Sequence, residues 1–313
     1  MQFFGLFSTF FVNLLRKYLD NCEFCCTFAA GMKIFKQIVT WLGIMAGLTL
    51  LAIGLWYILF HGSQSTGSLK WFQFLQTFAT FLMPPILCAW MWETNHRPFV
   101  WLKLNHAPDW QTFLFAVGIM ICLLPGINLL ADLNSRIELP KSLDFIEQIF
   151  KQQEEAAAAL TERFLQADTI GQLLLNIGLM ALLPAFAEEL TFRGTLQQIL
   201  SSYQPSAVSR QQHLAIWITA FVFSAIHMQF YGFFPRMLMG ALFGYMLVWT
   251  GSLWIPVTMH FTNNALAVIA YYIGKDINIA DTFGTGDTWY IGVISLLITC
   301  PGLLIFYRRT RTQ

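Results

Sequence analysis

Long apolar stretches alternate with short polar ones along the chain, and most apolar stretches have the length of a membrane crossing. About 20 consecutive apolar residues form a helix that spans a bilayer. By this measure the sequence predicts about eight transmembrane helices, at residues 37–60, 71–92, 111–132, 170–200, 213–230, 235–250, 254–274 and 288–307. The pattern therefore predicts an all-α, polytopic membrane protein.

One polar interval is long enough to form an element of its own. Within the segment 133–169, residues 142–168 are rich in Glu, Gln and Ala, and apolar side chains recur there at helical spacing. One such set is Phe145, Ile146, Ile149 and Phe150. This spacing is typical of an amphipathic helix, which we expect to lie outside the membrane.

The same pattern divides the chain into five parts. The first has a short apolar run followed by polar residues, and we expect a cytoplasmic or interfacial segment there. Met32 precedes the first long apolar stretch, so translation could begin there rather than at Met1. The five parts are the N-terminal segment 1–36, three membrane helices in 37–132, the amphipathic segment 133–169, a C-terminal membrane domain in 170–307 and a basic tail at 308–313.

Composition agrees with a membrane protein and excludes one class of partner. Hydrophobic residues make up 56% of the 313 residues and charged residues 11%, against about 25% charged in a typical soluble domain. The net charge is +1 and no basic block occurs, which argues against nucleic-acid binding. The lipid bilayer is the partner that this composition predicts.

Basic residues near the ends of the predicted helices set the expected orientation, because they favour the cytoplasmic side. If the helices alternate in direction, most basic residues fall on one side: Lys33, Lys36, Arg97, Lys103, Arg210, Arg308, Arg309 and Arg311. The other side holds Lys70, Lys275 and the segment 133–169. We expect both termini to be cytoplasmic, with the protein in the cytoplasmic (inner) membrane.

Two adjacent glutamates interrupt one of the most apolar stretches. An acidic residue at the centre of a membrane helix costs about 2.5–3.5 kcal/mol, so it must face protein or water and by default marks a functional site. In a helix, Glu189 and Arg193 lie four residues apart on one face and can pair. Glu188 points about 100° away and stays available for chemistry. The alternative is a buried ion-pair cluster that holds helices in register.

Two further polar pairs follow in later membrane stretches. His227 lies four residues after Phe223, and Asn264 four residues after His260, so each pair would occupy one helix face. A lone histidine or asparagine in a membrane helix is more often an interhelical hydrogen-bonding group than a catalyst. Because three successive helices each contribute such groups, a shared intramembrane polar cavity is the better interpretation. This set suits activation of water and stabilisation of an oxyanion.

Together, these three ordered motifs resemble those of a known family. Glu188-Glu189-x-x-x-Arg193, Phe223-x-x-x-His227 and His260-x-x-x-Asn264 look like the motifs of the CAAX-protease and bacteriocin-processing family. These intramembrane proteases, of metalloprotease type, are also called the Abi or type II CAAX prenyl endopeptidase-like family. The resemblance covers roughly residues 165–275 and implies an eight-helix fold with a conical cavity open to the cytoplasm.

The resemblance also implies roles for these residues. Glu188 and His227 would activate the water, and His260 and Asn264 would form the oxyanion hole. Glu189, Arg193 and Phe223 would support the site. The resemblance leaves metal dependence open, since Glu188, His227 and His260 could hold a divalent metal such as zinc. We favour the metal-free mechanism, because His260 shares a helix face with Asn264.

The sequence thus predicts an intramembrane endopeptidase that acts on a peptide or a membrane-associated protein substrate. The alternative is a non-catalytic polytopic membrane protein, either a bacteriocin-immunity or scaffold relative or a proton-coupled transporter. A transporter also uses intramembrane carboxylates and histidines, but it usually shows internal repeats with matching broken segments. No such repeat is apparent, and the polar membrane groups gather after residue 180. This asymmetry favours the protease.

Overall fold

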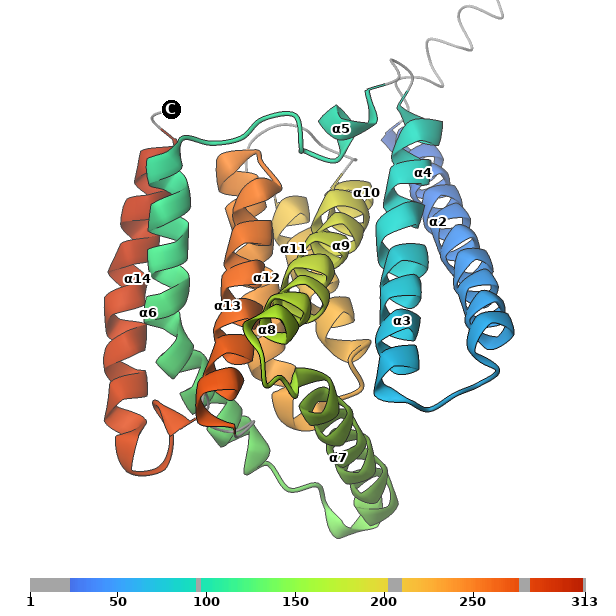
Figure 1. Cartoon of the computed structure of the whole chain (residues 1–313). Helices are drawn as coiled ribbons and strands as arrows, with labels where there is room; N and C mark the ends of the chain where they lie inside the picture. Colours follow the sequence, from blue (N-terminus) through green and yellow to red (C-terminus); the bar gives the residue numbers. More distant parts are fainter. Residues whose placement is uncertain (1–22, 94–96, 202–209, 276–281, 312–313) are drawn as a thin grey trace, which may run out of the picture.

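The computed structural model describes residues 23–93, 97–201, 210–275 and 282–311, which form helices joined by short loops and contain no strand (Figure 1). The N-terminal half contains α2 (Glu23–Phe60), α3 (Thr66–Gln76), η1 (Thr77–Leu82), α4 (Met83–Trp92), α5 (Pro98–Trp101), α6 (Trp110–Ser135), η2 (Lys141–Leu143) and α7 (Asp144–Leu165). The C-terminal half contains α8 (Ile170–Asn176), η3 (Ile177–Leu182), α9 (Leu183–Thr191), η4 (Phe192–Leu196), α10 (Gln197–Ser201), α11 (Arg210–Ala225), η5 (Phe230–Gly232), α12 (Phe233–Thr250), α13 (Trp254–Gly274), η7 (Gly286–Thr288) and α14 (Trp289–Thr310).

Six stretches of helix in the described residues are long and apolar enough to cross a membrane: Gly31–Phe60, Thr66–Trp92, Trp110–Ser135, Ile170–Ser201, Phe230–Thr250 and Gly286–Thr310. Each coincides with one of the eight predicted spans, but the count of eight is not confirmed. The other two predicted spans correspond to α11 and α13. Helix α11 has only 16 residues, and the polar side chains of His260, Asn263 and Asn264 reduce the hydropathy of α13.

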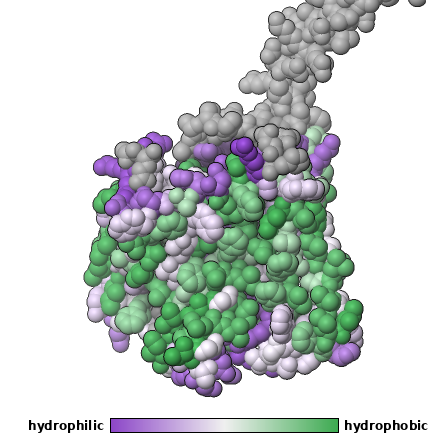
Figure 2. All heavy atoms as spheres, turned by 45° about the horizontal axis from the view of Figure 1, so that its top comes forward, coloured by the Kyte–Doolittle hydropathy of each residue, from purple (hydrophilic) through white to green (hydrophobic). Residues whose placement is uncertain are grey.

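The outer surface of the bundle is apolar where a bilayer would contact it. Figure 2 shows hydrophobic residues over most of the visible side, with hydrophilic residues gathered toward the two ends. On α2, Leu50 and Leu51 are each 69% exposed and Ile58 is 70% exposed. Such large apolar surfaces are compatible with lipid contact, and together with the six spans they indicate an integral membrane protein.

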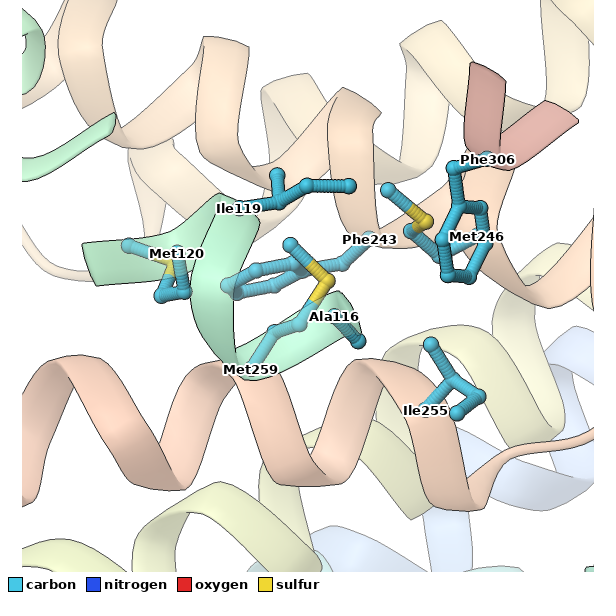
Figure 3. Packing of buried hydrophobic residues seen from close by; sticks show 8 residues of the cluster. All are labelled: Ala116, Ile119, Met120, Phe243, Met246, Ile255, Met259 and Phe306. Carbon is cyan, nitrogen blue, oxygen red and sulfur yellow. The ribbon is translucent and has the colours of Figure 1, made fainter. Parts of the chain in front are cut away.

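Helix α13 has a central place in the bundle, where it contacts α6, α9, α12 and the turn η3 (Figure 1). Eight buried residues from α6, α12, α13 and α14 form one packed cluster, drawn in Figure 3: Ala116, Ile119, Met120, Phe243, Met246, Ile255, Met259 and Phe306. One member, Phe243, also stacks on the ring of His260 at 5.4 Å between centroids. The core therefore extends directly to a predicted site residue.

Helices α3 and α4 join through the π-helical turn η1, and prolines explain this local structure. Pro85 has no N–H to donate to the carbonyl of Phe81, four residues earlier. The hydroxyl of Thr191 donates to that carbonyl instead, at 2.6 Å. An acceptor that the proline leaves unused thus ties α9 to the N-terminal helices.

The predicted extramembrane helix is present as α7, within the segment 133–169. It lies at the end of the bundle opposite the C-terminal end of α14 (Figure 1). Arg163 anchors it by donating to the hydroxyl of Thr66 at 2.9 Å and to the carbonyl of Gln64 at 2.5 Å. The ring of Phe150 stacks on that of Phe230 at 5.0 Å. Helix α7 therefore covers the loop between α11 and α12.

The predicted N-terminal segment 1–36 lies partly outside the described residues. Its described part, from Glu23, belongs to α2, which continues without interruption to Phe60. Similarly, the first residues of the predicted basic tail belong to the last turn of α14. The division of the chain into five parts stays a prediction.

Candidate active site

Both glutamates lie on the short helix α9, between the π-helical turns η3 and η4. Pro184 cannot donate to the carbonyl of Met180, which lies inside η3, and the widened turn accommodates that missing bond. Turns of this kind are frequent at functional sites within helices. The glutamates therefore lie where the helix departs from regular geometry on both sides.

Glu189 and Arg193 form the ion pair that their spacing predicts. Arg193 Nη1 donates to Glu189 Oε1 at 2.8 Å, and both side chains are fully buried. The second guanidinium nitrogen, Nη2, donates to the carbonyl of Gly240 at 2.8 Å. Buried charges are stable when paired and hydrogen-bonded, and these two bonds provide both, although Glu189 Oε2 and Arg193 Nε have no hydrogen-bond partner among the described residues.

Aromatic rings and a glycine complete the surroundings of Arg193. Its guanidinium carbon lies 4.5 Å from the ring centroid of Phe223 and 5.4 Å from that of Phe243. A Cβ atom at Gly240 would lie only 3.1 Å from Arg193 Nη2 and 3.2 Å from the Cα atom of Ala220. Glycine at this position thus lets α12 approach both the guanidinium and α11.

His260 joins the two glutamates. Its Nδ1 lies 2.9 Å from Glu189 Oε1, and its Nε2 lies 3.9 Å from Glu188 Oε2. The Glu189 side chain is fully buried, whereas that of Glu188 is 18% exposed. The sequence correctly separated Glu188 from the Glu189–Arg193 pair, but it did not indicate that one imidazole lies between both carboxylates.

An ionised Glu189 carboxylate can only accept, so next to it Nδ1 of His260 would be the protonated nitrogen. The neutral form of His260 then presents a lone pair at Nε2, and only the imidazolium can donate from both nitrogens. This condition bears on the role expected for His260 as an oxyanion donor.

His227 does not lie on a helix face with Phe223, so that part of the sequence interpretation is wrong. Helix α11 ends at Ala225, and His227 lies in the turn that follows. Met228 has a φ of 54°, in the left-handed region, which turns the chain away from the helix axis. His227 nevertheless stays close to Phe223: its Nδ1 is 2.7 Å from the Phe223 carbonyl, and the two rings are 5.0 Å apart.

This contact fixes the imidazole of His227. A carbonyl at the end of a helix lacks its intrahelical donor, and the Nδ1–H of His227 supplies one. The other ring nitrogen, Nε2, is then unprotonated in the neutral form and available as a base.

The turn that carries His227 is held by side chains that the sequence interpretation missed. The amide nitrogen of Asn134, on α6, donates to the carbonyl of Phe230 at 2.9 Å, and its amide oxygen accepts from the backbone N–H of Phe234 at 3.2 Å. Arg236 Nη2 donates to Gln229 Oε1 at 2.7 Å. For Arg236 a sequence signal existed, because it is a charged residue in an apolar stretch, as Glu188 is.

The predicted site residues are thus brought together to different degrees. Five are linked by contacts: Glu188, Glu189, Arg193, Phe223 and His260. His227 joins them through the ring of Phe223. Asn264 lies one turn after His260 on α13, where its amide oxygen accepts from Asn263 at 3.1 Å. The amide hydrogens of Asn264 are the part of its side chain suited to donate to an oxyanion.

The donor set of Glu188, His227 and His260 has the chemistry of a zinc site, but the three groups do not converge. Among the described residues, no group of three or more His, Cys, Asp or Glu side chains lies close enough to hold a metal ion. In this arrangement the three residues therefore do not fit a shared metal. Zinc binding by them stays a prediction.

Fold and site thus define an all-helical integral membrane protein with a polar cluster inside its helix bundle. Comparison with known families agrees: residues 170–266 match the family described as type II CAAX prenyl endopeptidase Rce1-like. The resemblance inferred from the three motifs is confirmed over this segment, which includes every predicted site residue. At the level of the family, the match supports a membrane protease.

One curated relative aligns with a stretch of similar length to the family match. The uncharacterized protein YpbD of Bacillus subtilis (strain 168) is 33% identical over 95 residues, which are 29% of this chain and 43% of YpbD. The chain therefore spans less than half the length of this relative. No solved structure matches the chain.

Proposed function

We propose that the protein is an intramembrane endopeptidase, resembling CAAX proteases, that hydrolyses a peptide bond of a membrane-associated protein or peptide. The observation that carries the proposal is the unequal use of two adjacent glutamates. Glu189 is fully buried and bonded to Arg193 and His260, whereas the Glu188 side chain is 18% exposed beside His260. A carboxylate that is not needed for a structural ion pair is available to take a proton from water.

In the proposed reaction, Glu188 and His227 act on the nucleophilic water. Glu188 removes a proton as the oxygen attacks the carbonyl carbon of the scissile bond, and the unprotonated Nε2 of His227 orients the water or shares that proton. The proton is then delivered to the leaving amine, and no covalent intermediate forms. General acid–base catalysis of this kind contributes about 10²–10⁴ in rate.

The oxyanion of the tetrahedral intermediate requires donors, and we assign this role to His260 and Asn264. Glu189 holds His260 Nδ1, so donation from Nε2 requires the imidazolium form. The two ring nitrogens lie 2.9 Å from the Glu189 carboxylate and 3.9 Å from that of Glu188. Asn264 adds neutral N–H donors one helical turn away, and such pre-oriented donors stabilise developing negative charge.

The assay for this function uses the purified protein and a peptide library. Cleavage is read by mass spectrometry, with the Glu188→Ala variant treated in parallel. We expect new peptide termini with the wild-type protein that are absent with the variant. Identical product patterns from both proteins, or no cleavage by a folded wild-type protein, would favour the non-catalytic alternative.

We also propose a cytoplasmic-membrane location with both termini cytoplasmic, which follows from the distribution of basic residues. Helix α7 then lies on the opposite side. In a variant without native cysteines, a cysteine at Glu155 should react with an impermeant maleimide on intact cells, and one at Arg311 should not. The reverse labelling pattern would invert the orientation and make the α7 end cytoplasmic.

A further inference from the structure

Arg236 is a charged residue near the start of α12 that the proposed reaction does not use. It lies one residue after Pro235 in the apolar stretch that begins at Phe233. Its Nη2 atom donates to Gln229, as described above. Its Nη1 atom is buried and makes no hydrogen bond within the described part of the structure. The guanidinium therefore has a donor to spare, which a purely structural tie to Gln229 does not explain.

Two carboxylates lie within electrostatic reach of this guanidinium. One is Glu188, the proposed base, and the other is Glu154, on the extramembrane helix α7. Burial raises the pKa of Glu154, and the positive charge of Arg236 opposes that shift. Glu154 Oε2 is also buried without a hydrogen-bond partner among the described residues. Both acids thus act on Arg236 electrostatically, but the described structure shows no ion pair of Arg236 with either.

The backbone beside Arg236 is shaped for a close approach. A Cβ atom on Gly232 would lie 2.9 Å from Arg236 Nη2 and 3.5 Å from its guanidinium carbon. Gly232 belongs to η5, the turn between His227 and α12. The guanidinium therefore lies directly against the chain segment that carries His227.

We propose that Arg236 binds a carboxylate of the peptide substrate and thereby determines which peptides reach Glu188. This inference rests on the proposed function. A planar guanidinium recognises a carboxylate through parallel N–H donors, and burial strengthens such charge-assisted bonds. The unused Nη1 supplies the donor, and the bond of Arg236 to Gln229, two residues after His227, places the bound carboxylate near the proposed water-activating groups. The carboxylate comes either from the C-terminus of the peptide or from an acidic side chain.

The test uses three pools of random apolar dodecapeptides. The first pool has free C-terminal acids, the second has C-terminal amides, and the third has C-terminal amides with a single Asp. Retention by the purified protein is quantified by mass spectrometry, using the Glu188→Ala variant so that bound peptides stay intact. We expect the acid pool, the Asp pool or both to be retained about tenfold better than the plain amides.

Three substitutions distinguish a role in recognition from a role in structure. Arg236→Gln should abolish the preference for carboxylate peptides, whereas Arg236→Lys should keep part of it, because charge remains without the planar fork. Gln229→Ala removes the structural tie but keeps the guanidinium, so it should preserve the preference. If Arg236→Gln does not fold, the lysine and Gln229 variants still decide the matter. Equal retention of all pools by the Glu188→Ala protein, or complete loss of preference in Gln229→Ala, would overturn the proposal.

Failure of this inference can be distinguished from failure of the proposed function. Wild-type protein that cleaves all three pools, while the Glu188→Ala variant shows no carboxylate preference, keeps the endopeptidase and removes the role of Arg236. A folded wild-type protein that cleaves no pool removes the endopeptidase instead.

Discussion

Two neighbouring regions of the polar cluster have the same chemistry and opposite environments. Around Glu189, the ion pair with Arg193 is fully buried, and His260 and the carbonyl of Gly240 make further hydrogen bonds to the two side chains. Around Glu188, the side chain is 18% exposed, and its ion-pair contact in the described structure is His260 Nε2 at 3.9 Å. In the proposed mechanism, the enclosed region holds the site together and the more open region takes part in the reaction.

Substitutions in the open region should have the largest effect, on rate alone. Glu188→Ala and His227→Ala should each lower peptide hydrolysis by about 10²–10⁴, because each removes a proposed acid–base group. Their melting temperatures in detergent should stay close to that of the wild-type protein. Near-normal turnover of a fluorogenic peptide by either variant would remove that residue from the mechanism.

Substitutions in the enclosed region should act on stability. Glu189→Ala or Arg193→Ala leaves a buried charge without its partner, at a cost of about 3–5 kcal/mol. Glu189→Gln, which keeps an acceptor for His260, should lose less than Glu189→Ala.

The double variant measures whether the two charges act as a pair. Its loss of stability should be smaller than the sum of the two single losses, because the second substitution removes the buried charge that the first left unpaired. Strictly additive melting shifts would show that the pair is not coupled.

The turn that carries His227 depends on Asn134, so Asn134→Ala should lower both the stability and the rate of peptide hydrolysis moderately. It leaves the carbonyl of Phe230 and the N–H of Phe234 without their present partner, which costs about 1–3 kcal/mol. Activity should fall with it. Asn128→Ala, on the same helix, removes a bond to the carbonyl of Phe283 and should leave activity unchanged. Equal losses of activity in the two variants would mean that the Asn134 contacts have no special role.

The smallest effect is expected on metal removal. Exhaustive chelation should leave activity unchanged, because Glu188, His227 and His260 do not converge on one point. Metal content is measured on the same sample. Activity that is lost and then restored by about one equivalent of zinc per chain would reverse the preference for a metal-free mechanism.

The sequence predicted what depends on local spacing. Glu189 and Arg193 pair because four residues bring side chains together on a helix, and α7 forms because its apolar residues recur at helical spacing. The contact of His260 with both glutamates depends on how α13 packs against α9, and spacing within one segment carries no information about that. His227 was assigned to a helix because its stretch is apolar, but Met228 adopts a left-handed conformation just after it.

Asn134 and Arg236 were overlooked for different reasons. Asn134 ends a helix far from the three motifs in sequence, and only the packing of α6 against η5 brings it to the turn. Arg236 could have been found, because a charged residue in an apolar membrane stretch is usually paired with another group or functional. The rule that singled out Glu188 applied to it equally.

The bond from Thr191 to the carbonyl of Phe81 has a consequence for how this protein can be divided. The stretch 170–266 matches a protease family, yet one of its helices satisfies an acceptor that Pro85 left open in a preceding segment of the chain. Without the preceding helices, that stretch would lose the hydrogen bond from Thr191 to Phe81 and the hydrogen bonds of Asn134. We therefore expect residues 170–266 to be less stable without the preceding helices than in the full chain.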